Sequence, residues 1–297
     1  MTSSTPAAEN SLFIKAMPGL FVLLWSTGFI GTKSGLPFAE PNTFLFLRFA
    51  ILVVLLVPFT LAIRAPWPAT KMAALHIAVA GILVHGGYLG GVFGAIGQGL
   101  PAGLVALIVG LQPLLTAFGA FLFLHESINR WQWTGLVLGL AGVGLVLSDR
   151  MDVTLWNWTG FALSIVALFG ITTGTLYQKR FCGHMDMRSG LAIQYAAAAI
   201  PIGFLALLFE TREVHWTWEF VGVMAWLVVV LSMGTVALLW IMVRRGAVSR
   251  VASLFYLVPP FTALMAWGLF GEEMGPLALI GLAVAATGVA LATKENR

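Results

Sequence analysis

The stretch LQPLLTAFGAFLFLHE, residues 111–126, ends in a His-Glu pair, which is how the zinc-hydrolase motif HExxH begins. In that motif a second histidine four residues after the first completes the metal site, and the glutamate acts as general base. Here Asn129 stands where the second histidine would be. We therefore predict no metal site and no cofactor, and we expect Glu126 to bond or cap a neighbouring helix end.

His85 and Tyr88 are three residues apart in an apolar segment, so in a helix they share a face. An imidazole and a phenol surrounded by hydrocarbon need hydrogen-bond partners, and both should therefore point into the protein. Two roles are open for these side chains: packing inside the protein with satisfied hydrogen bonds, and lining of a substrate path. All carboxylates fall in loops or near segment ends, so His85 is the only group at mid-depth expected to titrate near neutral pH.

Aromatic and hydroxyl-bearing side chains recur at similar depths in other apolar segments. Each one alone is more often packing than a site, but together they offer stacking surfaces and hydrogen bonds for an aromatic or amphipathic solute. Gln112, a polar residue beside a proline, is a further candidate for solute contact. The predicted substrate-binding residues are Trp25, His85, Tyr88, Gln112, Phe169, Tyr177, Ser232 and Tyr256.

Two prolines lie inside apolar segments. A proline in a helix removes one backbone hydrogen bond and clashes with the preceding turn, so we predict a kink at each. In lipid the freed carbonyl needs another partner or a cavity. The predicted structural or gating residues are Pro113, Pro259, Glu126 and Glu272.

Lys33 and Arg48 are expected towards the outer side of the membrane. Either cation could attract a carboxylate. We favour the alternative, in which each long side chain reaches, or snorkels, to the membrane interface.

The elements that position these residues follow from composition. The chain has 297 residues, of which 59% are hydrophobic and 9% charged, whereas soluble domains are about 25% charged. Apolar runs of about 20 residues, the length that crosses a bilayer as a helix, recur to the end of the chain. We predict an all-α membrane protein with ten transmembrane helices at 17–36, 42–63, 72–96, 101–124, 131–148, 156–179, 188–209, 217–243, 248–270 and 275–293.

Positive charge falls mainly on one side of this topology. If the N-terminus is cytoplasmic, twelve Lys and Arg residues lie in inside loops and ends, and Lys33, Arg150 and Arg212 lie outside. This bias fits the positive-inside rule. It predicts a multi-pass membrane protein with both termini cytoplasmic, with lipid around it and no nucleic-acid partner.

The chain repeats itself with a shift of 146 residues. Pro113 falls on Pro259, Glu126 on Glu272, Gly135 on Gly281 and Gly142 on Gly288, while Arg48 falls on Gln194. We predict two five-helix repeats, 1–150 and 151–297. Because five is odd, the second must enter the membrane in the opposite sense, an arrangement typical of transporters.

The doubled pattern of a proline-containing helix, a glutamate and a glycine-spaced last helix resembles the EamA-type drug/metabolite transporters. The segments LFVLLWSTGFIGTKSG, FLFLRFAI and GLPAGLVALIVGLQPLLTAF most resemble the bacterial aromatic amino acid exporters of the YddG type. The resemblance implies a protein of the bacterial inner (plasma) membrane that exports amino acids and related metabolites through a cavity between the two halves.

We predict a monomer that exports aromatic and other neutral, apolar amino acids by alternating access. A broader exporter of drugs or metabolites is the alternative, and an intramembrane enzyme and a channel are less favoured. Facilitated diffusion and His-mediated proton coupling both stay open.

Overall fold

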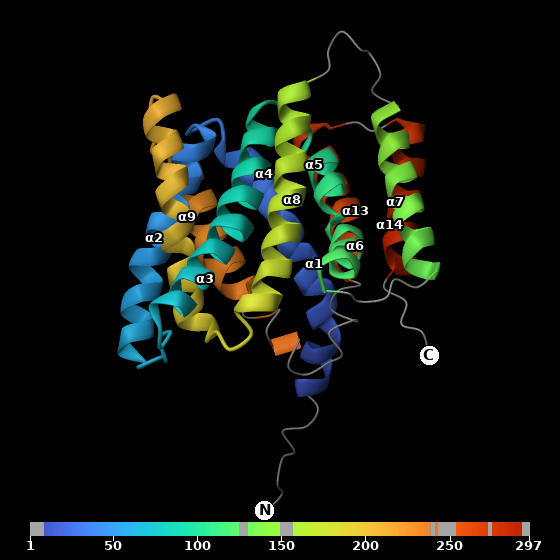
Figure 1. Ribbon diagram of the computed structural model, residues 1–297. Coiled ribbons are helices and arrows are strands. Elements are labelled where there is room, and N and C mark those ends of the chain that lie inside the picture. Colours follow the sequence, from blue (N-terminus) through green and yellow to red (C-terminus); the bar gives the residue numbers. More distant parts are fainter. Residues whose placement is uncertain are drawn as a thin grey trace, which may run out of the picture.

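A computed structural model describes residues 9–124, 130–148, 157–236, 238, 241–242, 254–272 and 275–292. Within these ranges every regular element is a helix, and the one extended pairing is an isolated antiparallel bridge between Ala39 and Val214. The helices lie side by side as a bundle (Figure 1). A helix satisfies its backbone hydrogen bonds internally, which is what a segment surrounded by lipid requires.

The first half of the chain forms five helical rods in succession, some built from consecutive elements. They are α1 (Glu9–Gly35), α2 (Pro41–Ala62), α3 (Lys71–Gly81) with the π-helical η1 (Ile82–Gly87) and α4 (Tyr88–Gly97), α5 (Ala102–Val109) with α6 (Gln112–Leu124), and α7 (Arg130–Ser148).

The second half follows the same order. Its elements are α8 (Trp158–Phe181), α9 (Met187–Phe209), α10 (Trp218–Ala225) with the π-helical η3 (Trp226–Thr235), the 3₁₀ turn η4 (Phe255–Leu257) with α13 (Val258–Phe270), and α14 (Pro276–Ala292). The predicted boundary between residues 150 and 151 lies outside the described residues.

Six helical stretches of the described chain are long and apolar enough to cross a membrane. They are Pro41–Ala62, Lys71–Gly97, Ala102–Gly119, Trp158–Phe181, Met187–Phe209 and Trp218–Thr235, with two shorter apolar helices at Val258–Phe270 and Pro276–Gly288. Large apolar side chains cover their outer faces; Ile200 is 75% exposed and Phe209 is 74% exposed. Lipid is the solvent that suits such a surface. The prediction of an all-helical membrane protein is therefore confirmed.

Helices are interrupted beside both prolines. Gly110 and Leu111 separate α5 from α6, and Pro113 is the second residue of α6; a 3₁₀ turn precedes α13, whose second residue is Pro259. Proline is tolerated in the first helical turn because the N–H groups there have no intrahelical acceptor. The two interruptions also touch, since a Cβ added to Gly110 would lie 2.8 Å from Cγ of Pro259.

Glycines let α7 and α14 approach backbone to backbone. A Cβ on Gly142 would lie 2.5 Å from the carbonyl oxygen of Gly281, and a Cβ on Gly288 would lie 2.7 Å from that of Gly135. As the residue number rises on one helix it falls on the other, so the two helices are antiparallel. Contacts between small residues of this kind bind helices together in lipid, where the hydrophobic effect contributes little.

Candidate functional site

A cavity of about 110 Å³ lies between α1, α2, η1, α4, α8, α9 and η3. One buried water needs about 10–15 Å³, so this space can hold a small molecule. Four of the predicted substrate-binding residues line it, namely Trp25, His85, Tyr88 and Ser232. Both halves of the chain contribute walls, which brings together residues that are up to about two hundred positions apart in the sequence.

Aromatic rings form much of the cavity wall. Trp25 packs edge-on against Phe255, with 4.9 Å between ring centroids, and at 5.4 Å from Phe21. On another side Tyr195 stacks on His85 with a centroid separation of 4.3 Å. These contacts hold the rings in place, and a planar solute entering the cavity would meet ring faces and edges.

His85 is part of a chain of polar side chains. Its Nε2 lies 3.2 Å from Oε1 of Gln194, and Nε2 of Gln194 donates to Oε1 of Gln178 at 2.9 Å. Because the Gln194 oxygen can only accept, this arrangement is satisfied when His85 carries its proton on Nε2. The π-helical turn η1 presents His85 to this chain, and π-helical turns often occur at functional sites.

Arg48 reaches the cavity from α2 and is only 3% exposed. Its Nη2 donates to Oγ of Ser232 at 2.9 Å, and that hydroxyl donates to the carbonyl oxygen of Leu227 at 2.9 Å. The Nε of Arg48 has no hydrogen-bond partner among the described residues. The interpretation that Arg48 snorkels to the interface is therefore wrong: α2 packs with its arginine turned inward, against α9 and η3. The signal in the sequence was a cation inside the predicted span 42–63, six residues after its start.

The other predicted substrate-binding residues do not meet at this cavity in the described structure. Gln112 lies 3.5 Å from Oγ1 of Thr175, joining α6 to α8, and Phe169 is 55% exposed. The hydroxyl of Tyr177 lies 2.7 Å from Nδ1 of His76.

Two further predictions cannot be placed. The side chain of Tyr256, and His125 and Glu126 altogether, lie outside the described residues. Tyr195 and Thr32 line the cavity without having been predicted. Tyr195 carries the same signal as the three tyrosines that were predicted, a phenol in an apolar segment, whereas a lone threonine in an apolar helix does not stand out.

Glu272 ties three elements together where α1 and α13 end. Its carboxylate pairs with Lys33 of α1 and accepts a hydrogen bond from the backbone N–H of Ala102, the first residue of α5, at 3.1 Å. The Lys33 ammonium also lies 4.7 Å from the ring centroid of Phe270. A carboxylate at a helix N-terminus is stabilised by the unpaired N–H groups there. Lys33 thus has a carboxylate partner within the protein.

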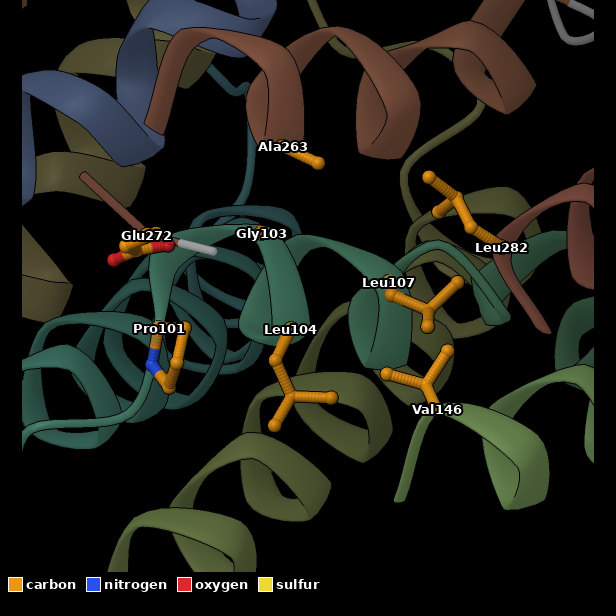
Figure 2. A pocket seen from close by; sticks show the side chains of 8 residues that line it. All are labelled: Pro101, Gly103, Leu104, Leu107, Val146, Ala263, Glu272 and Leu282. Atoms are coloured by element: carbon orange, nitrogen blue, oxygen red, sulfur yellow. The ribbon is translucent and has the colours of Figure 1, made fainter. Parts of the chain in front are cut away.

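A narrow space of about 10 Å³ runs below Glu272 between α5, α7, α13 and α14. Figure 2 shows Glu272 beside Pro101 and Gly103 at one end, with Leu107 and Leu282 at the other. At most one water fits there. It is a packing gap beneath the Glu272 contacts and not a second ligand site.

Two more glutamates join the halves near the same side of the bundle. Glu210, after α9, accepts from the backbone N–H groups of Asn42 and Thr43 at 2.8 and 2.7 Å and so caps α2. In return Glu40 accepts from the N–H and hydroxyl of Thr211 at 2.6 and 2.7 Å. The Thr211 hydroxyl and the neighbouring N–H groups hold the pKa of Glu40 below its ordinary value, outweighing its slight burial.

An apolar helical bundle that encloses a partly polar cavity between its two halves is the architecture of a membrane transport protein. The sequence profile described as the EamA-like transporter family matches residues 19–148 and again residues 158–294. The chain therefore belongs to the EamA-like transporter family. This confirms the predicted family and a membrane transporter, and it excludes the intramembrane enzyme.

Similar proteins cover between 66% and 93% of the chain. A probable amino-acid metabolite efflux pump of Salmonella typhimurium is 29% identical over 91% of this chain and 91% of its own length. A probable terminal-alkyne amino-acid exporter of Streptantibioticus cattleyicolor is 27% identical over 66% of each chain. A solved crystal structure with 22% identity has a TM-score of 0.64 over 93% of this chain and 94% of that one, which shows a shared fold.

Proposed function

We propose that this protein exports aromatic and other neutral, largely apolar amino acids across the bacterial plasma membrane by alternating access. The observation that carries the proposal is the cavity between the halves, where Trp25, Tyr88 and Tyr195 supply rings beside a few polar groups. The names of the similar proteins, amino-acid efflux pump and exporter, support amino acids as the substrate class. The transporter would act as a monomer with ten spans and both termini in the cytoplasm.

Alternating access is supported by contacts that recur between equivalent residues when the two halves of the chain are exchanged. The 146-residue shift turns the pair Gly135 and Gly288 into the pair Gly281 and Gly142, and both pairs are in close contact. Contacts that map onto each other in this way are expected when two similar halves are related by a two-fold axis. Halves of opposite orientation can exchange conformations and so open the cavity to one side and then the other.

The π-helical turns follow the same relation. Shifted by 146 residues, η1 at 82–87 becomes 228–233, which lies within η3 at 226–235. Arg48 and its counterpart Gln194 both reach the polar groups of these turns, Arg48 at Ser232 and Gln194 at His85. The cavity would therefore be built from equivalent parts of inverted repeats.

Energy coupling in the proposal does not use a carboxylate, because no Asp or Glu lines the cavity among the described residues. Facilitated diffusion down the amino-acid gradient needs no titrating group. Coupling through protonation of His85 is the alternative. A pH gradient distinguishes them, since only the second would make efflux depend on it.

Efflux from proteoliposomes tests the proposal. Vesicles are loaded with radiolabelled Phe, Trp or Thr or with a cationic dye, and efflux is followed with and without a pH gradient. We expect saturable, protein-dependent efflux of Phe and Trp. Efflux of the dye at a similar rate would favour the broader drug exporter, and unsaturable flux would favour a channel. Folded protein that moves no amino acid would refute the proposal.

A further inference from the structure

We propose that Arg48 is the carboxylate-binding group of the cavity, so that the transporter takes small molecules that carry a carboxylate and rejects organic cations that lack one. The inference rests on the proposed function, whose cavity it concerns, and it narrows the substrate class by charge. The geometry that points to it is a buried guanidinium facing the cavity with part of its hydrogen-bonding capacity unused.

A buried cation needs a counter-charge. Taking a guanidinium out of water is unfavourable unless an anion and hydrogen bonds replace its hydration. Arg48 is 3% exposed, and among the described residues it has no ion pair; the side-chain ion pairs there are Lys33 with Glu272 and Arg188 with Asp186. The protein surrounds Arg48 with neutral groups. A bound anion would supply the missing charge.

The unused donors of Arg48 suit a carboxylate. Nη2 is engaged with Ser232, while Nε has no partner among the described residues. The planar guanidinium presents its N–H groups in a fixed fork that matches the two oxygens of a carboxylate. A substrate carboxylate in the cavity would accept hydrogen bonds from the guanidinium, which Ser232 already holds in place.

The other walls of the cavity determine which chemical groups the rest of the substrate can carry. Trp25 and Tyr88 offer ring surfaces for an apolar or aromatic side chain. A substrate ammonium group would meet ring faces and neutral polar atoms, because no carboxylate of the described residues lines the cavity. A zwitterion or a simple carboxylate would therefore bind, whereas an organic cation would face Arg48 with like charge.

Ligand binding to the purified full-length protein in detergent tests the inference without depending on transport. Fluorescence change or thermal-shift titration would compare phenylalanine, phenylpyruvate, phenylalaninamide and phenethylamine, which share the ring and differ in carboxylate and amine. We expect the two carboxylates to bind about 10- to 100-fold more tightly than the amide and the amine, the range for hydrogen bonds between charged groups.

Arg48→Met should abolish this preference by weakening carboxylate binding while leaving the amide nearly unchanged. Arg188→Met, at an exposed arginine in the first turn of α9 paired with the capping Asp186, is the matched control and should keep the preference. If Arg48→Met does not fold, equal binding of acid and amide by the unaltered protein would still overturn the inference.

Equal binding of acid and amide, or a preference that survives Arg48→Met, would overturn the inference, and the proposed amino-acid export could still hold. Binding of phenylpyruvate through Arg48 without any efflux of amino acids would support the inference while refuting the proposed function.

Discussion

Glu272 is expected to hold the bundle closed at the end where α1 and α13 finish. Replacing it by glutamine keeps its shape and removes its charge. The carboxylate serves two donors, Lys33 and the N–H of Ala102, and its side chain is 10% exposed whereas that of Lys33 is 31% exposed. Hydrogen bonds to charged groups contribute about 1.5–3 kcal/mol each, and partial exposure of Lys33 reduces its share towards that of a surface pair.

We expect Glu272→Gln to weaken the closed arrangement by about 1.5–2.5 kcal/mol, provided that opening separates these groups. At 1.4 kcal/mol for each factor of ten, the open population would rise about 10- to 60-fold. Thr32 offers the reporter, because it lines the cavity and is 1% exposed. In a Cys182→Ser background, which removes the chain's one cysteine, Thr32→Cys can be labelled with a membrane-impermeant maleimide.

The labelling rate from the Glu272 side should rise by that factor in Glu272→Gln. Glu213→Gln, in the exposed segment after α9, is the control and should leave the rate unchanged. A Glu272→Gln rate equal to that of the control would show that the Lys33–Glu272–Ala102 contacts do not gate access, and the reasoning from charge and burial would be refuted.

Three further predictions concern packing, pH and the site. Gly142→Ala should destabilise the protein by about 1–3 kcal/mol, because its Cβ would lie 2.5 Å from the Gly281 carbonyl oxygen; thermal unfolding measures this. Glu40 has a lowered pKa in the folded protein, so its stabilising contribution is present above its ordinary pKa of 4.5 and is lost as pH falls through the lower folded value. The gap in unfolding temperature between the unaltered protein and Glu40→Gln should therefore shrink as pH falls from 7 into that range. Trp25→Ala and Tyr88→Ala should raise the apparent KM for aromatic substrates more than they reduce expression.

Each of these has a matched comparison. Gly144→Ala adds the same methyl group two residues away, where nothing lies within 4 Å, and should be neutral; equal destabilisation by both would contradict the packing argument. If the difference in unfolding temperature between the unaltered protein and Glu40→Gln does not change with pH, the loss of stability comes from the shape of the side chain and not from its charge. If Trp25→Ala and Tyr88→Ala lower only expression, both rings belong to packing and the substrate lies elsewhere.

Much of the site could be predicted from residue type. Polar and aromatic residues in a hydrocarbon environment are costly or conspicuous, and four of those chosen for this reason, Trp25, His85, Tyr88 and Ser232, lie together at the cavity. The same criterion also selected Phe169, which lies on an exposed face of α8, and Tyr177, which bonds to His76. The type of a residue indicates which environment its side chain needs, but it does not indicate which neighbouring residues provide that environment.

The sequence by itself determined a helical membrane protein, its approximate helix positions and the 146-residue repeat, because these depend on apolar length and spacing along the chain. Its resemblance to known sequences indicated the transporter family. The tertiary structure decided how each helix is rotated about its axis. In lipid both the inner and the outer faces of a helix can be apolar, so the usual amphipathic pattern that marks the inward face is weak. Packing of α2 against α9 and η3, and not any local pattern, turned Arg48 into the cavity. Packing of α1 against α13 joined Lys33 to Glu272 across 239 residues of sequence.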